Sequence, residues 1–452
     1  MSEGRNRVRL NHAILLAMTA TLLLACSRED RLEGQRLDIR ASLDEPLVNE
    51  DGTPIPEPEF VNRVADFKAP RQTNLSSWTH RNGNAQHNLP HLALSPELTR
   101  LWTVDIGKGN SPKYRLTAEP VVANGLVYTL DSQSHLKAHS LIGAEVWSRD
   151  LVPVSDSNAD ATGGGLAYAD GVIYATTGFG EVIAMSADTG AHLWTQKLGA
   201  VAMAPPTVVG KHVYVVARDN KAWALNVKNG RIVWNQQSAQ ADLGQVGGAA
   251  PAVAGRQVFL PFSSGEMIAA FTNNGLRVWS VAISGSRLGL GRSSLGDITS
   301  DPVVSGARVY AANQSGRMTA VNSRSGERLW TSKQGAYSPA LVFGNAVFIV
   351  SDALQLVRLD GRNGETVWAV DLPGFVERRE RRHKTVYASY GPVLAGGRLL
   401  VASGDGLLRG FDPESGDLIS QTEIPGGAAS APVIVDGVLY IVSSKGQLHA
   451  FK

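Results

Sequence analysis

One sequence motif, which we call the phrase, recurs along most of the chain, and its regular spacing constrains the fold more than any other feature. The clearest copy lies between residues 306 and 330. It holds an apolar pair that ends in an aromatic residue, a polar turn, a second apolar run, a glycine turn, and a last apolar segment that ends in tryptophan. Short apolar runs separated by such turns predict consecutive antiparallel strands.

Eight copies of the phrase can be aligned on the aromatic position, and six of them keep the final tryptophan. The aromatic position holds Tyr128, Tyr174, Tyr214, Phe259, Tyr310, Phe348, Leu400 and Tyr440. The tryptophan position holds Trp147, Trp194, Trp234, Trp279, Trp330 and Trp368, with Ser420 in the seventh copy. Four short strands per copy predict an all-β fold, an eight-bladed β-propeller of four-stranded antiparallel blades. The tryptophans are expected to pack between neighbouring blades.

The last copy stops at Lys452 after three strands, so one blade lacks its fourth strand. The segment 101–105 looks like a final blade strand that has no glycine turn of its own before it. We predict that this segment pairs with the C-terminal blade, which closes the ring and hides two sheet edges.

The first 26 residues predict export from the cytoplasm. Arg5, Arg7 and Arg9 precede an apolar run over 13–25 that is too short to span a membrane. The run ends in Leu-Leu-Ala-Cys at 23–26, which resembles the bacterial lipoprotein box and implies a cleaved signal peptide and a lipid on Cys26. An ordinary signal peptide that happens to contain a cysteine is the alternative.

Residues 27–72 have no sustained apolar period and contain five prolines, which is typical of an extended tether. The expected organisation is therefore a signal peptide over 1–25, a lipidated cysteine and tether over 26–72, and a propeller over 73–452. The formal net charge is +2, and no basic stripe with interleaved aromatics is present, which argues against nucleic-acid binding.

His80 and His87 stand before the first repeat without a supporting carboxylate at a metal-binding spacing, so a structural cap over the ring is expected there and no metal. The connections between blades are long and individual at 148–164, 235–249, 280–301 and 371–390. They share one face with the turns between second and third strands, and long loops on a rigid scaffold usually carry function.

The last of these loops contains a basic run over 377–384. Such a run is most often a solvated surface, and the alternative is a contact with an acidic partner or lipid headgroups.

The order and spacing of residues in the repeats, best seen from Asp188 through Gly190 to Trp194, resembles the pyrroloquinoline-quinone-type propeller repeat. One branch of that superfamily holds quinone-dependent dehydrogenases, which need carboxylates and an amide for Ca²⁺ and often a cysteine pair. The chain has a single cysteine and scattered aspartates that fall in turn positions. We therefore expect no catalytic residues, no cofactor and no bound metal.

The other branch holds non-catalytic propellers, notably the BamB lipoproteins of the outer-membrane β-barrel assembly machine. The resemblance covers about 74–452 and implies a scaffold that binds the periplasmic domains of BamA, the barrel component. A Leu-x-Asp-x-Asp stretch of that family engages BamA. Asp297 matches its first acid, Thr299 stands at the second, and Asp301 follows two residues later.

A second contact motif of that family, a Leu-x-Leu-Arg loop, is matched by Leu243 alone, and Arg287 or Arg292 is the candidate for its cation. Leu243, Arg292 and Asp297 are thus the expected partner-binding residues. Nascent outer-membrane proteins are a further expected partner, held by strand addition at exposed blade edges or at the face with the long loops. The alternatives are a quinone-dependent oxidoreductase and a glycan-binding propeller.

Overall fold

The structure is a computed structural model that describes residues 60–202, 204–239, 248–283, 285, 296–377, 379 and 385–452. The signal peptide and Cys26 lie outside the described residues. Val61 to Lys452 form one compact unit. The last twelve residues of the segment expected to be a tether therefore belong to the same unit as the blades. Among the described residues, no helix is long and apolar enough to cross a bilayer.

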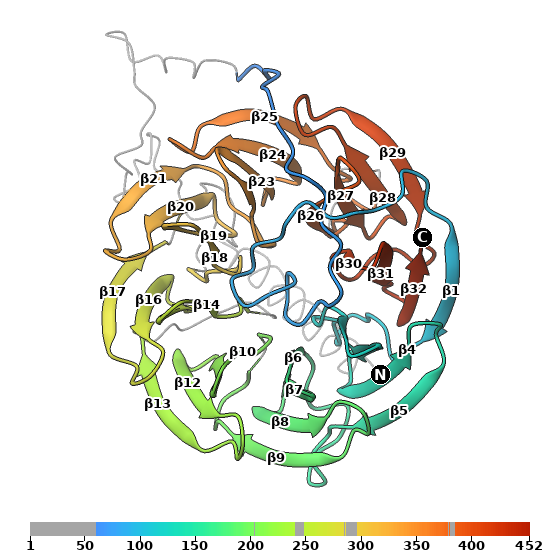
Figure 1. Cartoon of the computed structure of the whole chain (residues 1–452), viewed down its shortest axis with the longest axis vertical. Helices are drawn as coiled ribbons and strands as arrows, with labels where there is room; N and C mark the ends of the chain where they lie inside the picture. The colour runs from blue at the N-terminus through green and yellow to red at the C-terminus, as the bar shows by residue number, and fades with distance from the viewer. Residues whose placement is uncertain are drawn as a thin grey trace, which may run out of the picture. The chain divides into compact units, whose positions relative to one another are not determined.

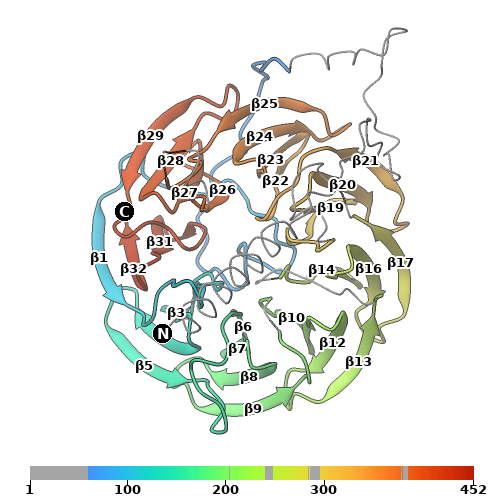
Figure 2. The same ribbon diagram turned by 180° about the vertical axis from the view of Figure 1, so that it is seen from behind.

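Eight four-stranded antiparallel sheets form a ring, as the repeats predict (Figure 1, Figure 2). Blade 1 holds β2 (Val121–Ala123), β3 (Leu126–Leu130), β4 (His135–Ser140) and β5 (Glu145–Asp150). Blade 2 holds β6 (Gly164–Ala169), β7 (Val172–Thr177), β8 (Glu181–Ser186) and β9 (His192–Lys197). Blade 3 holds β10 (Thr207–Val209), β11 (His212–Val216), β12 (Lys221–Asn226) and β13 (Ile232–Gln237). Blade 4 holds β14 (Ala252–Ala254), β15 (Gln257–Pro261), β16 (Glu266–Phe271) and β17 (Arg277–Ala282).

The second half of the ring repeats this order, with the first strand of each blade innermost. Blade 5 holds β18 (Val303–Ser305), β19 (Arg308–Asn313), β20 (Arg317–Asn322) and β21 (Arg328–Ser332). Blade 6 holds β22 (Leu341–Phe343), β23 (Ala346–Val350), β24 (Gln355–Asp360) and β25 (Thr366–Asp371). Blade 7 holds β26 (Ser389–Ala395), β27 (Arg398–Ser403), β28 (Leu407–Phe411) and β29 (Leu418–Glu423). Blade 8 holds β30 (Val433–Val435), β31 (Val438–Val442), β32 (Gln447–Phe451) and β1 (Arg100–Asp105).

The ring is closed by pairing between the two ends of the propeller. β1 runs antiparallel to β32, with Trp102 opposite Ala450. Trp102 also takes the place of the missing blade tryptophan, because its ring lies 5.9 Å from that of Tyr440. Its indole nitrogen donates to Leu141 O of blade 1 at 3.0 Å, so the predicted closure is confirmed.

The core lies between adjacent blades and depends on the repeated aromatic residues. In blade 2, Trp194 packs 5.9 Å from Tyr174 and donates from its indole nitrogen to Val227 O of blade 3 at 2.9 Å. Gly230 of blade 3 lies against the face of the same indole, where a Cβ atom would come within 2.5 Å of the ring. The tryptophans therefore join neighbouring blades, as the sequence predicts.

Residues 73–94, which we call the cap, cross one end of the ring (Figure 1). The cap exchanges backbone hydrogen bonds with the inner strands of several blades, much as an added strand would. These bonds join Trp78 with Val122, Thr79 with Tyr168, Ala85 with Val253, Gln86 with Val304, and Leu92 with Leu394. The cap thus connects the inner strands of blades 1, 2, 4, 5 and 7.

Candidate partner-binding site

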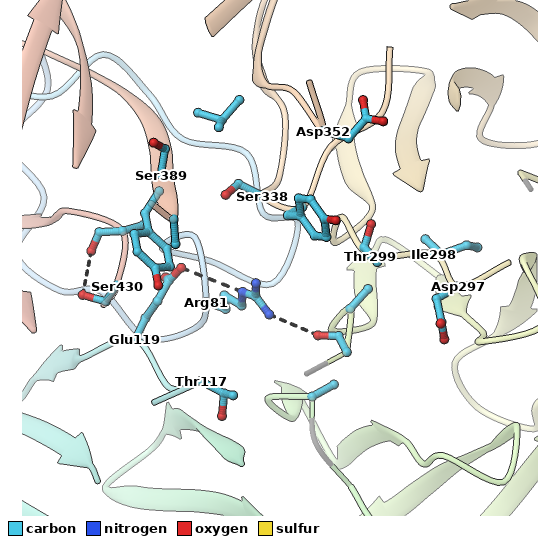
Figure 3. Close-up of a pocket in the computed structure, with 18 of the residues that line it drawn as sticks. Arg81, Thr117, Glu119, Asp297, Ile298, Thr299, Ser338, Asp352, Ser389 and Ser430 are labelled. Carbon is cyan, nitrogen blue, oxygen red and sulfur yellow. Dashed lines mark hydrogen bonds and ion pairs between the residues drawn. The ribbon is translucent and has the colours of Figure 1, made fainter. Parts of the chain in front are cut away.

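The loops between blades and the turns between second and third strands surround a funnel on the propeller axis. Its volume is about 400 Å³. The lining includes Ile298 and Ala388 from loops between blades and Arg218 and Leu354 from turns between second and third strands. Both kinds of connection therefore share one face, as predicted. The cap closes the opposite end, and Arg81 of the cap reaches the floor of the funnel (Figure 3).

Arg81 lies between the fully buried Asp301 carboxylate and the largely buried Glu119 carboxylate on this floor. Its Nε is 3.1 Å from Asp301 Oδ2 and 3.8 Å from Glu119 Oε1, and its Nη1 donates to Gly248 O at 3.1 Å. Ala250 N donates to Asp301 Oδ1 at 2.7 Å. One guanidinium thus joins the cap to residues that precede the inner strands of blades 1, 4 and 5.

The electrostatics of this cluster follow from its burial. The Asp301 side chain is 0% exposed, and that of Glu119 is 12% exposed. Burial raises the pKa of both carboxyls, while the Arg81 guanidinium opposes the shift. Two acids around one cation leave the floor with surplus negative charge when both are ionised. Asp301 holds the cap in place, so it is not a surface acid that could replace the one absent at Thr299.

The expected partner-binding residues divide into one that the structure places and two that it does not describe. Asp297 lines the funnel and is 5% exposed, next to Ile298, which forms an antiparallel bridge with Asn313 (Figure 3). Thr299 donates from Oγ1 to Ala336 O at 2.7 Å. Leu243 and Arg292, like Arg287, lie outside the described residues.

His80 and His87 are structural parts of the cap. The Nε2 of His80 contacts both the carbonyl and the amide of Val208, at 3.1 and 3.0 Å, and Nδ1 of His87 lies 2.9 Å from Pro302 O. Burial lowers the pKa of each imidazole to about 4, so both are neutral near pH 7. The described residues contain no group of three or more His, Cys, Asp or Glu side chains placed to hold a metal.

An apolar surface lies at the mouth of the funnel. Phe375 pairs with Val386 across an antiparallel bridge, and Val376 N donates to Thr385 O at 2.9 Å. These contacts make a two-stranded stem for the basic loop, of which residues 378 and 380–384 lie outside the described residues. Phe375, Val376, Val386 and Tyr337 are 38 to 47% exposed, and Val386 and Tyr337 also line the funnel. We call these four side chains the mouth patch.

Sequence reasoning did not single out Arg81 or Glu119. Arg81 follows His80 in a segment outside the repeats, whereas Glu119 and Asp301 stand at the same position of two copies, each one proline away from its inner strand. The available signal was this pair of equivalent acids, each followed by Pro-Val-Val at the start of an inner strand, where burial is expected.

Comparison with known proteins places the repeats in a family. The family described as "Outer membrane protein assembly factor BamB" matches residues 132–370 and 359–452. The protein of that name from Escherichia coli is 31% identical over 337 residues, which is 63% of this chain and 83% of the relative.

Solved structures agree on the fold. The crystal structure of BamB from Moraxella catarrhalis superposes with a TM-score of 0.66 at 20% identity and covers 79% of this chain and all of that one. A europium-containing methanol dehydrogenase superposes with a TM-score of 0.62 at 14% identity and covers 83% of this chain and 98% of that one. At such identities both likenesses show the propeller alone.

Proposed function

The chain belongs to the BamB family of outer membrane protein assembly factors, and from that membership we propose that it is a non-catalytic scaffold of the outer-membrane β-barrel assembly machinery. In this proposal it binds the periplasmic domains of a BamA-type barrel protein and assists the insertion of barrel proteins. The observation that carries the proposal is the family match, which runs through the blades to Lys452.

The face around the funnel is the proposed site of BamA binding. The mouth patch offers exposed aromatic and aliphatic side chains beside a polar funnel, which is the composition of a protein interface with a few dominant anchors. Asp297 lies on the wall of the same funnel. We place Leu243 and Arg292 in the same interface because their loops join blades 3 to 4 and 4 to 5 at this face.

The proposal includes attachment to the periplasmic side of the outer membrane through lipid on Cys26. A signal peptide over 1–25 and a tether from residue 26 onward would leave the propeller free to reach a membrane-bound partner. Mass spectrometry of the mature protein tests this directly. A diacylated or triacylated N-terminal cysteine is expected, and an unmodified mature N-terminus elsewhere would exclude the anchor.

The proposed absence of catalysis rests on what the carboxylates already bind. Glu119 and Asp301 hold Arg81 and backbone amides. Asp131, Asp219 and Asp405 accept backbone hydrogen bonds within their own turns. A quinone-dependent oxidoreductase would instead bind added quinone and Ca²⁺, show a bound chromophore and oxidise alcohols with a dye, which tests the alternative. A glycan array tests the glycan-binding alternative.

The decisive experiment is purification of the full-length lipoprotein from detergent-solubilised outer membranes, with identification of whatever remains bound. Near-stoichiometric recovery of a BamA-type protein is expected. Phe375→Ala should reduce that recovery because it removes an exposed anchor of the mouth patch, and Ile142→Ala is the matched control on the opposite face, where Ile142 is 81% exposed. Failure of the wild-type chain to retain any barrel protein would refute the scaffold proposal.

A further inference from the structure

The outer strand of every blade has a β-bulge at one particular aliphatic residue. Pairing with the third strand skips the residue directly before the tryptophan position, so this residue lies on the rim of the ring with its neighbours displaced outward. The bulge residues are Leu101, Val146, Leu193, Val233, Val278, Leu329, Val367 and Ile419. Six of them are 40 to 55% exposed, whereas Val367 of β25 is only 4% exposed.

Val367 is buried because a segment of the chain itself lies along the edge of β25. We call residues 62–67 the strap. Arg63 N donates to Val367 O at 3.0 Å, and the Asn62 side chain both donates to Ala369 O and accepts from Ala369 N, each at 2.9 Å. The strap therefore satisfies three outward-facing backbone groups of β25, one through its own backbone and two through the Asn62 side chain. Figure 1 shows this segment passing β25 on its way to the cap.

The strap is held at blade 6 by features that the other blades do not share. Phe67 packs edge-on against Phe348 at 5.4 Å, and Arg358 donates to Ala65 O at 2.5 Å and to Asp66 O at 2.8 Å. Arg358 stands in the middle of the third strand, where six of the other copies have alanine. The side chains that hold the strap are thus particular to blade 6. The edge that the strap covers has the same bulge and the same backbone geometry as the outer strands of the other blades.

The edge of β13 in blade 3 resembles that site without the strap from Val233 to Asn235, and beyond this stretch Gln237 O accepts a hydrogen bond from Arg277 Nη2 of blade 4 at 3.3 Å. Its bulge residue is Val233, and by register Asn235 presents the same outward amide and carbonyl as Ala369 does in β25. Ile232 and Val233 are 45 and 44% exposed, and β13 contains no charged residue of the kind that natural proteins use to block edges. β13 also leads directly into the loop that holds Leu243.

We propose that the outer edge of β13 binds unfolded strands of outer-membrane barrel proteins by strand addition, at the backbone groups that correspond to those the strap occupies on β25. This rests on the proposed function and names the client site. The occupant must be extended, alternate apolar with polar residues so that one face covers Ile232 and Val233, and lack charge at its centre. Strands of membrane barrels have this alternation over about ten residues.

The test uses the full-length protein in detergent and a fluorescent eleven-residue peptide that alternates valine or leucine with threonine or serine. Asn235→Pro removes the outward N–H donor at an edge position where proline is tolerated, and Asn235→Ala keeps the donor. We expect about tenfold weaker peptide binding for Asn235→Pro and unchanged binding for Asn235→Ala, from the loss of one to two hydrogen bonds. Equal binding by all three proteins would overturn the proposal.

A second measurement does not depend on the folding of a variant. A peptide methylated on alternate backbone nitrogens keeps every side chain but cannot pair with a strand edge, so the wild-type protein should lose it. A photoreactive residue at 233 should cross-link to the unmodified peptide, and one at 367 should not, because the strap covers that edge. If the methylated peptide binds as tightly as the unmodified one, the contact is not strand addition and the inference is wrong.

The experiments can refute the client site on β13 without refuting the scaffold function, and the reverse. Asn235→Pro should still recover the BamA-type protein because β13 lies on the rim and not at the mouth patch. Loss of peptide binding with BamA recovery intact supports the client site. Peptide binding by a wild-type chain that recovers no barrel protein would refute the scaffold and leave the edge site standing.

Discussion

Replacing Arg81 by methionine tests how the cap is attached to the blades. The change keeps much of the side-chain volume but removes the one cation that faces Asp301 at 3.1 Å and Glu119 at 3.8 Å. Asp301 keeps its hydrogen bond from Ala250 N, and Glu119 keeps the one from Asn82 N at 3.2 Å. Two buried carboxyl groups are left without a compensating charge.

Breaking a buried ion pair by removing one partner costs about 3–5 kcal/mol. We expect a loss of unfolding free energy at the lower end of this range, about 3 kcal/mol at pH 8. The Arg81 side chain is 19% exposed, and its distance of 3.8 Å to Glu119 in the wild type is long. Burial already raises the pKa of Glu119 and of Asp301, and loss of the guanidinium raises both pKa values further. A carboxyl whose folded-state pKa is raised stabilises the fold below its unfolded pKa and loses that contribution as pH rises through the folded pKa. The deficit of Arg81→Met should therefore be smallest at acid pH and grow toward pH 8.

The assay is urea unfolding of the wild type and variant, followed by tryptophan fluorescence, at pH 5, 6, 7 and 8. Taking the difference between the two proteins cancels groups that both share. The double variant Arg81→Met with Asp301→Asn should recover much of the deficit at pH 8, because asparagine can still accept from Ala250 N without a charge. A deficit that is constant with pH, or that grows toward acid pH, would refute this account of the cluster.

Three further outcomes follow from the cap and from the joints between blades. Burial lowers the pKa of His87 from 6.5 to about 4, so the wild type should lose stability as pH falls from 6.5 toward 4, and His87→Gln should flatten that loss in thermal melts at each pH. Gly230→Ala should lower the free energy of unfolding by several kcal/mol, because the added Cβ clashes with Trp194 and the positive φ adds a backbone strain of about 1 kcal/mol. Gly210 also has a positive φ but faces open space, so Gly210→Ala should show only the strain when both variants are unfolded in urea. Trp102→Ala should lower stability by about 2–3 kcal/mol, less than a fully buried tryptophan, and raise the hydrogen-exchange rate of β1 and β32 amides; unchanged exchange there would contradict a closing role.

The spacing of the repeats was sufficient to predict the blades, their number and the closure of the ring. Six copies of the repeat bring their own aromatic residue, turn and tryptophan, so the contacts that form each of these blades join residues within about forty positions of one another. The strand that holds Trp102 could be assigned because it completes a pattern in which six other copies have the tryptophan. Local periodicity also assigned the loops to one face, since strands that alternate in direction leave no other choice.

The contacts of the cap, the funnel and the strap could not be predicted in this way and became visible in the folded chain. Arg81 meets Asp301, and Arg63 meets Val367, across hundreds of residues and from segments that have no period, so no spacing in the sequence announces either contact. The burial of Asp301 and the exposure of Val233 likewise depend on which segment happens to lie over them. Closure of the ring brings the residues before the inner strands together at one axis. The funnel therefore combines positions that are far apart in the sequence.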